Sequence, residues 1–251
     1  EIGPLGDVID ACLIKPRAAR LGSARALCEV LEAIARPHAT GARGSAPANP
    51  YAGLAAFQER DAARFFGREA AVAHVVARLA EQPLLALIGA SGAGKSSLVR
   101  AGVIPALRHS GDAWEAFVLR PGPHPLAALA DLVIQEGWQR APAAAPSPGD
   151  PPATDAPTDH AALVARLRDE PGLLGALARG RSRQRRERIL LVVDQFEEAY
   201  TLAAAPERDA WFACLAGAAD DATSPLRVII AIRHDFLDRV AGSSTVLAEL
   251  V

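Results

Sequence analysis

One stretch of the chain, LIGASGAGKSSLVRAG at residues 87–102, places glycines, a lysine and two serines directly after an apolar run. It contains the full pattern G-x-x-x-x-G-K-[ST]. Glycines let a loop wrap so that several backbone N–H groups point inward, and a following helix adds the positive end of its dipole. This combination is suited to binding a phosphate group. The predicted cradle consists of Gly89, Ala90, Ser91, Gly92, Ala93, Gly94, Lys95, Ser96 and Ser97.

Two side chains of this cradle carry complementary chemistry. Lys95 is expected to reach the β- and γ-phosphates of a nucleotide, and the Ser96 hydroxyl is expected to join the shell of a Mg²⁺ ion. The alternative is a glycine-rich turn with an incidental lysine. The motif lies between a predicted strand at 84–88 and a predicted helix that begins at Lys95, which is the context that phosphate binding requires. A nucleotide with Mg²⁺ is therefore the expected ligand.

A second group of polar residues follows another apolar strand. In ILLVVDQFEEAY, residues 189–200, the apolar run ends at Asp194, and Glu197 and Glu198 follow shortly after. Because ligands bind at the carboxyl ends of parallel strands, Asp194 suits the Mg²⁺ shell, and one glutamate suits positioning or deprotonation of an attacking water. The alternative for the glutamates is capping of the next helix. The metal assignment requires Asp194 to lie close to Ser96.

A third apolar strand brings an arginine to the same edge of the predicted sheet. It lies in RVIIAIRHDFLDRV, residues 227–240, and ends at Arg233. An arginine at this position could sense a γ-phosphate. The alternative is a surface salt bridge with Asp235 or Asp238, and spacing alone favours neither.

Composition excludes several classes of partner. The net charge of −2 gives no reason to expect nucleic acid or a membrane surface. The basic run RGRSRQRRER at 179–188 lacks interleaved aromatics and directly precedes a strand, so a solvated approach segment is favoured over a nucleic-acid site. The apolar runs are too short for a membrane helix and no signal peptide is recognisable, so we expect a cytoplasmic protein. Cys12, Cys28 and Cys214 are expected to be buried free thiols.

The elements that must position these groups alternate along the chain. Short apolar, β-branched strands separated by helices predict an α/β fold of the P-loop NTPase type, with a parallel sheet covered by helices on both faces. The expected strands are 84–88, 114–119, 189–193 and 227–232. The expected helices are 70–81, one from 95, 125–135, pieces of 159–178, and 207–218.

Composition also divides the chain. Residues 37–50 have the Pro, Gly, Ala and Ser content of a linker, which separates a short helical N-terminal segment, 1–36, from the main domain, 51–251. Residues 140–159 are rich in Pro and Ala and are interpreted as a disordered insert, or else as a second boundary. The sequence has no Met and ends inside a helical pattern, so we expect it to be part of a longer protein.

Together these motifs resemble a known family, the novel STAND NTPases, which are signal-transduction ATPases of large bacterial multidomain proteins. The four segments that carry the resemblance are NPYAGLAAFQERDAARFFGRE (49–69), LLALIGASGAGKSSLVRAGVIPALR (84–108), LLVVDQFEEAYTL (190–202) and IAIRHDF (230–236). The resemblance implies ATP or ADP as ligand, with Phe66, Gly67 and Arg68 around adenine and sugar. It further implies Asp194 as the Mg²⁺ residue, Glu198 as the hydrolytic acid with Glu197 as substitute, and Arg233 as the sensor.

The N-terminal segment has a resemblance of its own. LGDVIDACLIKPRAARLGSARALCEVLEAI is similar to the last helices of bacterial serine/threonine protein kinase domains. The residues that match the kinase pattern are Cys12, Leu13, Lys15, Arg20 and Ser23. The two resemblances imply a kinase fused to a STAND ATPase. The implied partners are the kinase and sensor or repeat domains of the same polypeptide, and further copies of the chain on activation.

The predicted function is therefore a Mg²⁺-dependent regulatory ATPase switch with slow hydrolysis. A different class, a non-hydrolysing module that assembles partners when it binds nucleotide, remains the alternative. A phosphotransferase on the same fold would need an arginine-bearing lid, and residues 140–159 contain only Arg140.

Overall fold

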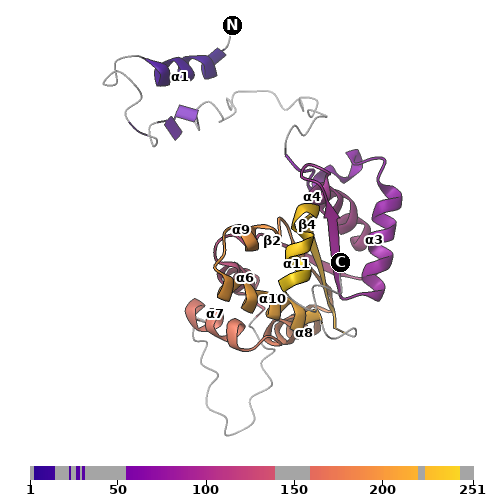
Figure 1. The fold of residues 1–251 in the computed structure, drawn as a ribbon. Helices are drawn as coiled ribbons and strands as arrows, with labels where there is room; N and C mark the ends of the chain where they lie inside the picture. The colour runs from indigo at the N-terminus through magenta and orange to yellow at the C-terminus, as the bar shows by residue number, and fades with distance from the viewer. Residues whose placement is uncertain are drawn as a thin grey trace, which may run out of the picture. The chain divides into compact units, whose positions relative to one another are not determined.

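The structure, a computed structural model, comprises two compact units, Glu1–Asn49 and Pro50–Val251, hereafter the N-terminal and C-terminal units (Figure 1). The residues that it describes are 3–14, 23, 27–28, 30–31, 55–138, 159–219 and 224–243. The predicted linker at 37–50 lies outside the described residues. So does the predicted insert at 140–159, except for Asp159, whose side chain accepts a hydrogen bond from the Ala161 amide and caps the following helix.

The N-terminal unit contains the helix α1 (Gly3–Leu13), on which Val8 is buried. Residues 27–28 and 30–31 are also helical, and the Leu27 amide donates to the Ser23 carbonyl at 3.1 Å. The expectation of buried thiols is wrong for Cys28, which is exposed, and for Cys12, which is only half-buried, because so short a segment cannot cover every apolar side chain.

The C-terminal unit alternates helices and strands as the sequence predicts. Its strands are β1 (Leu84–Gly89), β2 (Trp114–Leu119), β3 (Arg188–Val193) and β4 (Leu226–Arg233). Its helices are η2 (Glu59–Arg64), α3 (Glu69–Glu81), α4 (Lys95–Ser97), η3 (Leu98–Val103), α5 (Ile104–Arg108), α6 (Pro125–Gln135), α7 (His160–Asp169), α8 (Leu173–Arg185), α9 (Glu198–Thr201), α10 (Ala205–Ala219), η4 (His234–Phe236) and α11 (Leu237–Ser243). Within the described parts of the chain, no helix is both long and apolar enough to cross a bilayer.

The four strands form one parallel sheet in the order β1-β4-β3-β2, which confirms the predicted fold class. The strands β3 and β4 are central and almost wholly buried, whereas the edge strands β1 and β2 are partly exposed. This explains why the central strands are continuous apolar runs, since both of their faces must be covered. All four carboxyl ends meet at one edge of the sheet.

Side chains of each strand alternate between two apolar cores, one on each face of the sheet. Leu190 and Val192 point to a core shared with α3, η3 and α5. Leu191 and Val193 point to a larger core, to which α6, α7, α8 and α10 contribute. Figure 1 shows these four helices together on one side of the sheet. Cys214 lies in the larger core, where burial raises the pKa of its thiol to about 12, so it is an inert apolar side chain as expected.

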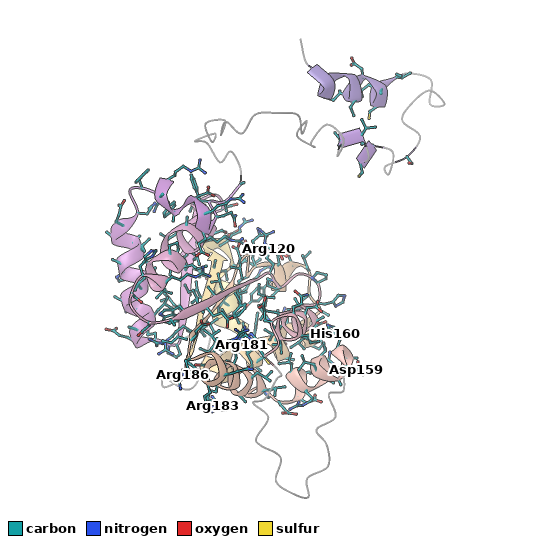
Figure 2. All side chains as sticks on the ribbon, turned by 180° about the vertical axis from the view of Figure 1, so that it is seen from behind. Arg120, Asp159, His160, Arg181, Arg183 and Arg186 are labelled. Carbon is teal, nitrogen blue, oxygen red and sulfur yellow. The ribbon has the colours of Figure 1, made fainter. Side chains whose placement is uncertain are left out.

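The basic run at 179–188 differs from its prediction in one respect. Most of it belongs to α8, and while Arg183 and Arg186 are exposed, Arg181 is only 6% exposed (Figure 2). The guanidinium of Arg181 forms two hydrogen bonds, at 2.6 and 2.9 Å, with the Glu115 carboxylate on β2. The prediction of a solvated segment fails for Arg181 because charge content alone does not reveal a partner on a distant strand.

Candidate functional site

The predicted phosphate cradle forms a loop between the end of β1 at Gly89 and the start of α4 at Lys95. Gly92 and Gly94 have φ of +74° and +84°, which is left-handed backbone that a side chain would strain. These two glycines therefore allow the loop to wrap. The Lys95 ammonium lies within the loop and donates to the carbonyls of Gly89 at 2.8 Å and Ala90 at 2.9 Å.

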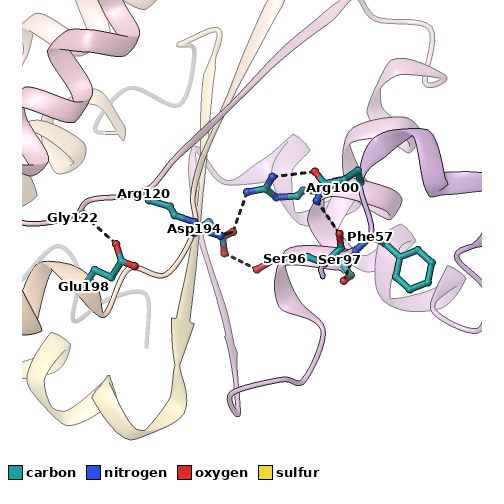
Figure 3. Close-up of polar contacts among 10 residues, drawn as sticks. Phe57, Ser96, Ser97, Arg100, Arg120, Gly122, Asp194 and Glu198 are labelled. Atoms are coloured by element: carbon teal, nitrogen blue, oxygen red, sulfur yellow. Dashed lines mark hydrogen bonds and ion pairs between the residues drawn. The ribbon is translucent and has the colours of Figure 1, made fainter. Parts of the chain in front are cut away.

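The loop meets Asp194, the residue directly after β3, as the metal assignment requires. The Ser96 hydroxyl donates to Asp194 Oδ1 at 2.7 Å (Figure 3). Asp194 is 3% exposed, and its amide donates to the Leu119 carbonyl at 2.8 Å, so the β2–β3 pairing continues into this residue. Two segments that are 98 residues apart in sequence thus place two oxygen donors side by side.

The second oxygen of Asp194 faces two arginines that sequence reasoning missed. Arg100 Nη2 donates to Asp194 Oδ2 at 3.2 Å, and Arg120 Nη2 lies 4.0 Å from the same oxygen (Figure 3). Both had a signal in the sequence. Arg100 lies one helical turn after Ser96 on the same helix face, and Arg120 directly follows β2, as Asp194 follows β3.

The two glutamates after Asp194 point to different places. The turn that carries them contains Gln195 at φ +56° and is anchored by Phe196, which is fully buried and stacks on Phe212 with ring centroids 5.2 Å apart. Glu197 lines the cleft described below, and its Oε2 is buried with no hydrogen-bond partner among the described residues. Glu198 Oε2 instead accepts a hydrogen bond from the Gly122 amide at 3.2 Å.

Arg233 lies opposite Gly89 in the β1–β4 register, at the start of the loop. Its guanidinium forms two hydrogen bonds with the Asp235 carboxylate, at 3.0 and 2.6 Å, and this pairing lowers the pKa of Asp235. The salt bridge foreseen as the alternative is therefore present. Arg233 also lines the cleft, so its position is compatible with contact to a ligand.

The implied role of Phe66, Gly67 and Arg68 around adenine and sugar stays a prediction. Phe66 is 76% exposed, and none of the three lines the cleft. Residues that precede them do line the cleft, namely Ala55, Ala56 and Phe57, and the Phe57 amide donates to Ser97 Oγ at 3.1 Å (Figure 3).

These groups surround one open cleft at the carboxyl edge of the sheet, with a volume of about 670 Å³. Ligand sites are typically of this size. Its charged lining combines three cations with two carboxylates and continues into the glycine-rich loop. The lining residues that bear charge are Lys95, Arg120, Arg233, Asp194 and Glu197.

The donors present fit Mg²⁺ bound together with a nucleotide. Within the described ranges, no group of three or more His, Cys, Asp or Glu side chains could hold a metal ion by itself. Mg²⁺ characteristically uses one or two protein oxygens together with phosphate oxygens and water. Ser96 Oγ and Asp194 Oδ1, which are 2.7 Å apart beside the loop, are two such oxygens.

Comparison with known proteins supports the same interpretation. None of the curated proteins and none of the solved structures matches the chain. The family model described as novel STAND NTPase 1 matches residues 50–251, which is the C-terminal unit almost residue for residue. This family is one of nucleotide-binding NTPase modules, in agreement with the glycine-rich loop and the cleft beside it. The chain therefore belongs to the novel STAND NTPase 1 family.

Proposed function

We propose that the cleft binds ATP with Mg²⁺ and hydrolyses it slowly, and that the bound nucleotide sets the state of a regulatory switch. The observation that carries this proposal is the 2.7 Å contact between Ser96 and Asp194 at the open end of the glycine-rich loop. A hydroxyl from the loop and a carboxylate from a neighbouring strand end are the pair that a Mg²⁺-nucleotide site uses.

The loop supplies the phosphate contacts. Its backbone N–H groups and the start of the following helix favour an anion, and Lys95 adds a full positive charge. The Lys95 ammonium then exchanges its bonds to the Gly89 and Ala90 carbonyls for charge-assisted bonds to phosphate oxygens, which are stronger. Ser96 and Asp194 would hold the Mg²⁺ ion, which would neutralise phosphate charge.

We assign activation of the attacking water to Glu197 and keep Glu198 as the alternative. The attacking water needs a hydrogen-bond acceptor that also takes its proton. Glu197 lines the cleft, and no hydrogen bond from the described residues holds its Oε2 in place. Glu198 is engaged with the Gly122 amide and would have to release it. Glu198 therefore suits a role in holding the loop after β2.

Arg100 is proposed to position Asp194 for this chemistry. Its guanidinium bridges Asp194 Oδ2 at 3.2 Å and Gln58 Oε1 at 3.2 Å. Asp194 is nearly fully buried, and a buried carboxylate needs fixed hydrogen-bond partners in place of the water that it has lost. The bridge also ties the segment before η2 to the metal-binding carboxylate.

The regulatory part of the proposal concerns the whole polypeptide. The N-terminal unit ends where the family match begins. We infer from the residues of its sequence alone that it resembles the last helices of a serine/threonine kinase domain. We propose that the nucleotide state of the cleft controls such a kinase domain and sensor domains in the same cytoplasmic, bacterial protein, with self-association on activation.

The experiment that tests binding replaces Lys95. Lys95→Ala removes the only full charge inside the phosphate loop and should abolish ATP binding while the chain stays folded. ATP affinity is measured by calorimetric titration, and folding by circular dichroism. Arg78→Ala, which removes an exposed cation on α3 that is paired with Gln82, should leave the affinity unchanged. Retained binding by a folded Lys95→Ala chain would reject the cradle.

A single-turnover assay of phosphate release separates a slow ATPase from the alternative, a module that only binds nucleotide. Release from bound ATP supports hydrolysis. Its complete absence, with binding intact, supports the non-hydrolysing module.

A further inference from the structure

We propose that Arg120 is the arginine that contacts the terminal phosphate of a bound triphosphate, so that it discriminates ATP from ADP. This assignment rests on the proposed function and goes beyond it, since sequence patterns pointed to Arg233 for this role.

The sheet itself places Arg120 beside the proposed metal site. Leu119 pairs with Val193 in the β2–β3 register, and the Leu119 carbonyl accepts the Asp194 amide. Arg120, the first residue after β2, therefore leaves the sheet next to Asp194. Its side chain lines the cleft, and its Nη2 lies 4.0 Å from Asp194 Oδ2 (Figure 3).

Arg120 is also the arginine of this site that is held most weakly. Arg100 is hydrogen-bonded to Asp194 and Gln58, and its side chain is 23% exposed. Arg233 is engaged in two hydrogen bonds with Asp235.

By contrast, Arg120 makes no hydrogen bond within the described residues, and its side chain is 57% exposed. Although Asp194 is buried, Arg120 itself is solvent-exposed and the pair is long, at 4.0 Å without a hydrogen bond, so a small free-energy cost releases Arg120 toward a ligand. Its guanidinium has five N–H donors in a planar fork that matches phosphate oxygens.

Arg120 is the first residue of a loop that can transmit a movement of Arg120 to neighbouring segments. Residues 120–125, RPGPHP, contain three prolines with fixed φ and lead into α6, which starts at Pro125. The Gly122 amide in the same loop is held by Glu198 Oε2. A movement of Arg120 toward a terminal phosphate therefore acts on a stiff segment that already contacts the acidic turn after β3.

The test compares ATP and ADP affinities of the full chain with those of Arg120→Ala and Arg120→Gln, in the presence of Mg²⁺. We expect the affinity for ATP to fall about tenfold in both variants, because one charge-assisted contact is lost, and the affinity for ADP to stay within about twofold. Arg120→Lys should restore part of the ATP affinity, since it keeps the charge but not the fork. Arg166→Ala is the matched control, because the Arg166 side chain is also 57% exposed and its partner, Glu170, lies four residues further along the chain and is itself exposed.

Three results would overturn the assignment. Equal losses for ATP and ADP would make Arg120 a general binding or structural residue. No loss for either nucleotide would exclude a phosphate contact, and an ATP-selective loss in Arg233→Ala alone would return the role to Arg233. A wild-type chain that binds neither nucleotide would remove the proposed function itself, which is a distinguishable failure.

Discussion

The two ends of the sheet both carry charged side chains, but the ends differ in how completely these side chains are hydrogen-bonded. At the amino end, Arg181 is held by both oxygens of Glu115, and the buried Arg227 donates to the carbonyls of Leu79, Ser224 and Leu226. At the carboxyl end, Arg120 lies 4.0 Å from its nearest carboxylate and Glu197 Oε2 has no partner among the described residues.

This difference distinguishes charged side chains that stabilise the fold, at the amino end, from charged side chains that remain available to a ligand, at the carboxyl end. A buried charge is retained only when fixed partners replace its water, as at the amino end. At the carboxyl end, the partners of Arg120 and Glu197 are incomplete. Such features are characteristic of sites where a ligand completes the contacts.

The largest effect on stability is expected at the amino end. Glu115→Ala leaves Arg181 buried without its partner and should lower the free energy of unfolding by about 2 to 3 kcal/mol, measured by urea denaturation. ATP affinity of the folded chain should not change. The control Glu170→Ala removes an exposed partner of Arg166 and should have no measurable effect. An unaltered unfolding free energy in Glu115→Ala would show that the amino-end pair is not structural.

The next effect concerns the unpartnered oxygen at the carboxyl end. Glu197→Gln keeps the shape but not the proton acceptor, so hydrolysis should slow by about a hundredfold while ATP stays bound. Glu198→Gln, which weakens only the contact to Gly122, should slow it less. Phosphate release in a single turnover is the measurement. A larger loss in Glu198→Gln would exchange the two roles, and unaltered release in both variants would remove the glutamates from the mechanism.

Much of the fold could be predicted because local patterns determine it. The central strands are fully apolar since they are covered on both faces, and the observed β3 and β4 differ from the predicted ranges by single residues. The loop from Gly89 to Ser96 was recognisable because the positive φ of Gly92 and Gly94 restricts those positions to glycine. The strand-end rule likewise located Asp194 and Arg233.

Contacts between distant segments could not be predicted in the same way. Nothing in the local pattern around Arg181 indicates that Glu115 lies opposite it. Similarly, the doublet of Glu197 and Glu198 does not reveal which carboxylate enters the cleft, because the answer depends on the left-handed turn at Gln195 and the buried ring before them. Arg120 directly follows β2, so the strand-end rule places it at the same edge of the sheet as Asp194 and Arg233.

The central claim is that Ser96 and Asp194 hold the Mg²⁺ ion that binds together with the nucleotide. ATP affinity should therefore be measured with and without Mg²⁺ for the wild-type chain and for Asp194→Asn, with Asp112→Asn as a matched carboxylate-to-amide control at the opposite end of the sheet. We predict that Mg²⁺ strengthens ATP binding about tenfold in the wild type and in Asp112→Asn, and that this gain disappears in a folded Asp194→Asn chain. A gain that persists undiminished in Asp194→Asn would contradict the account.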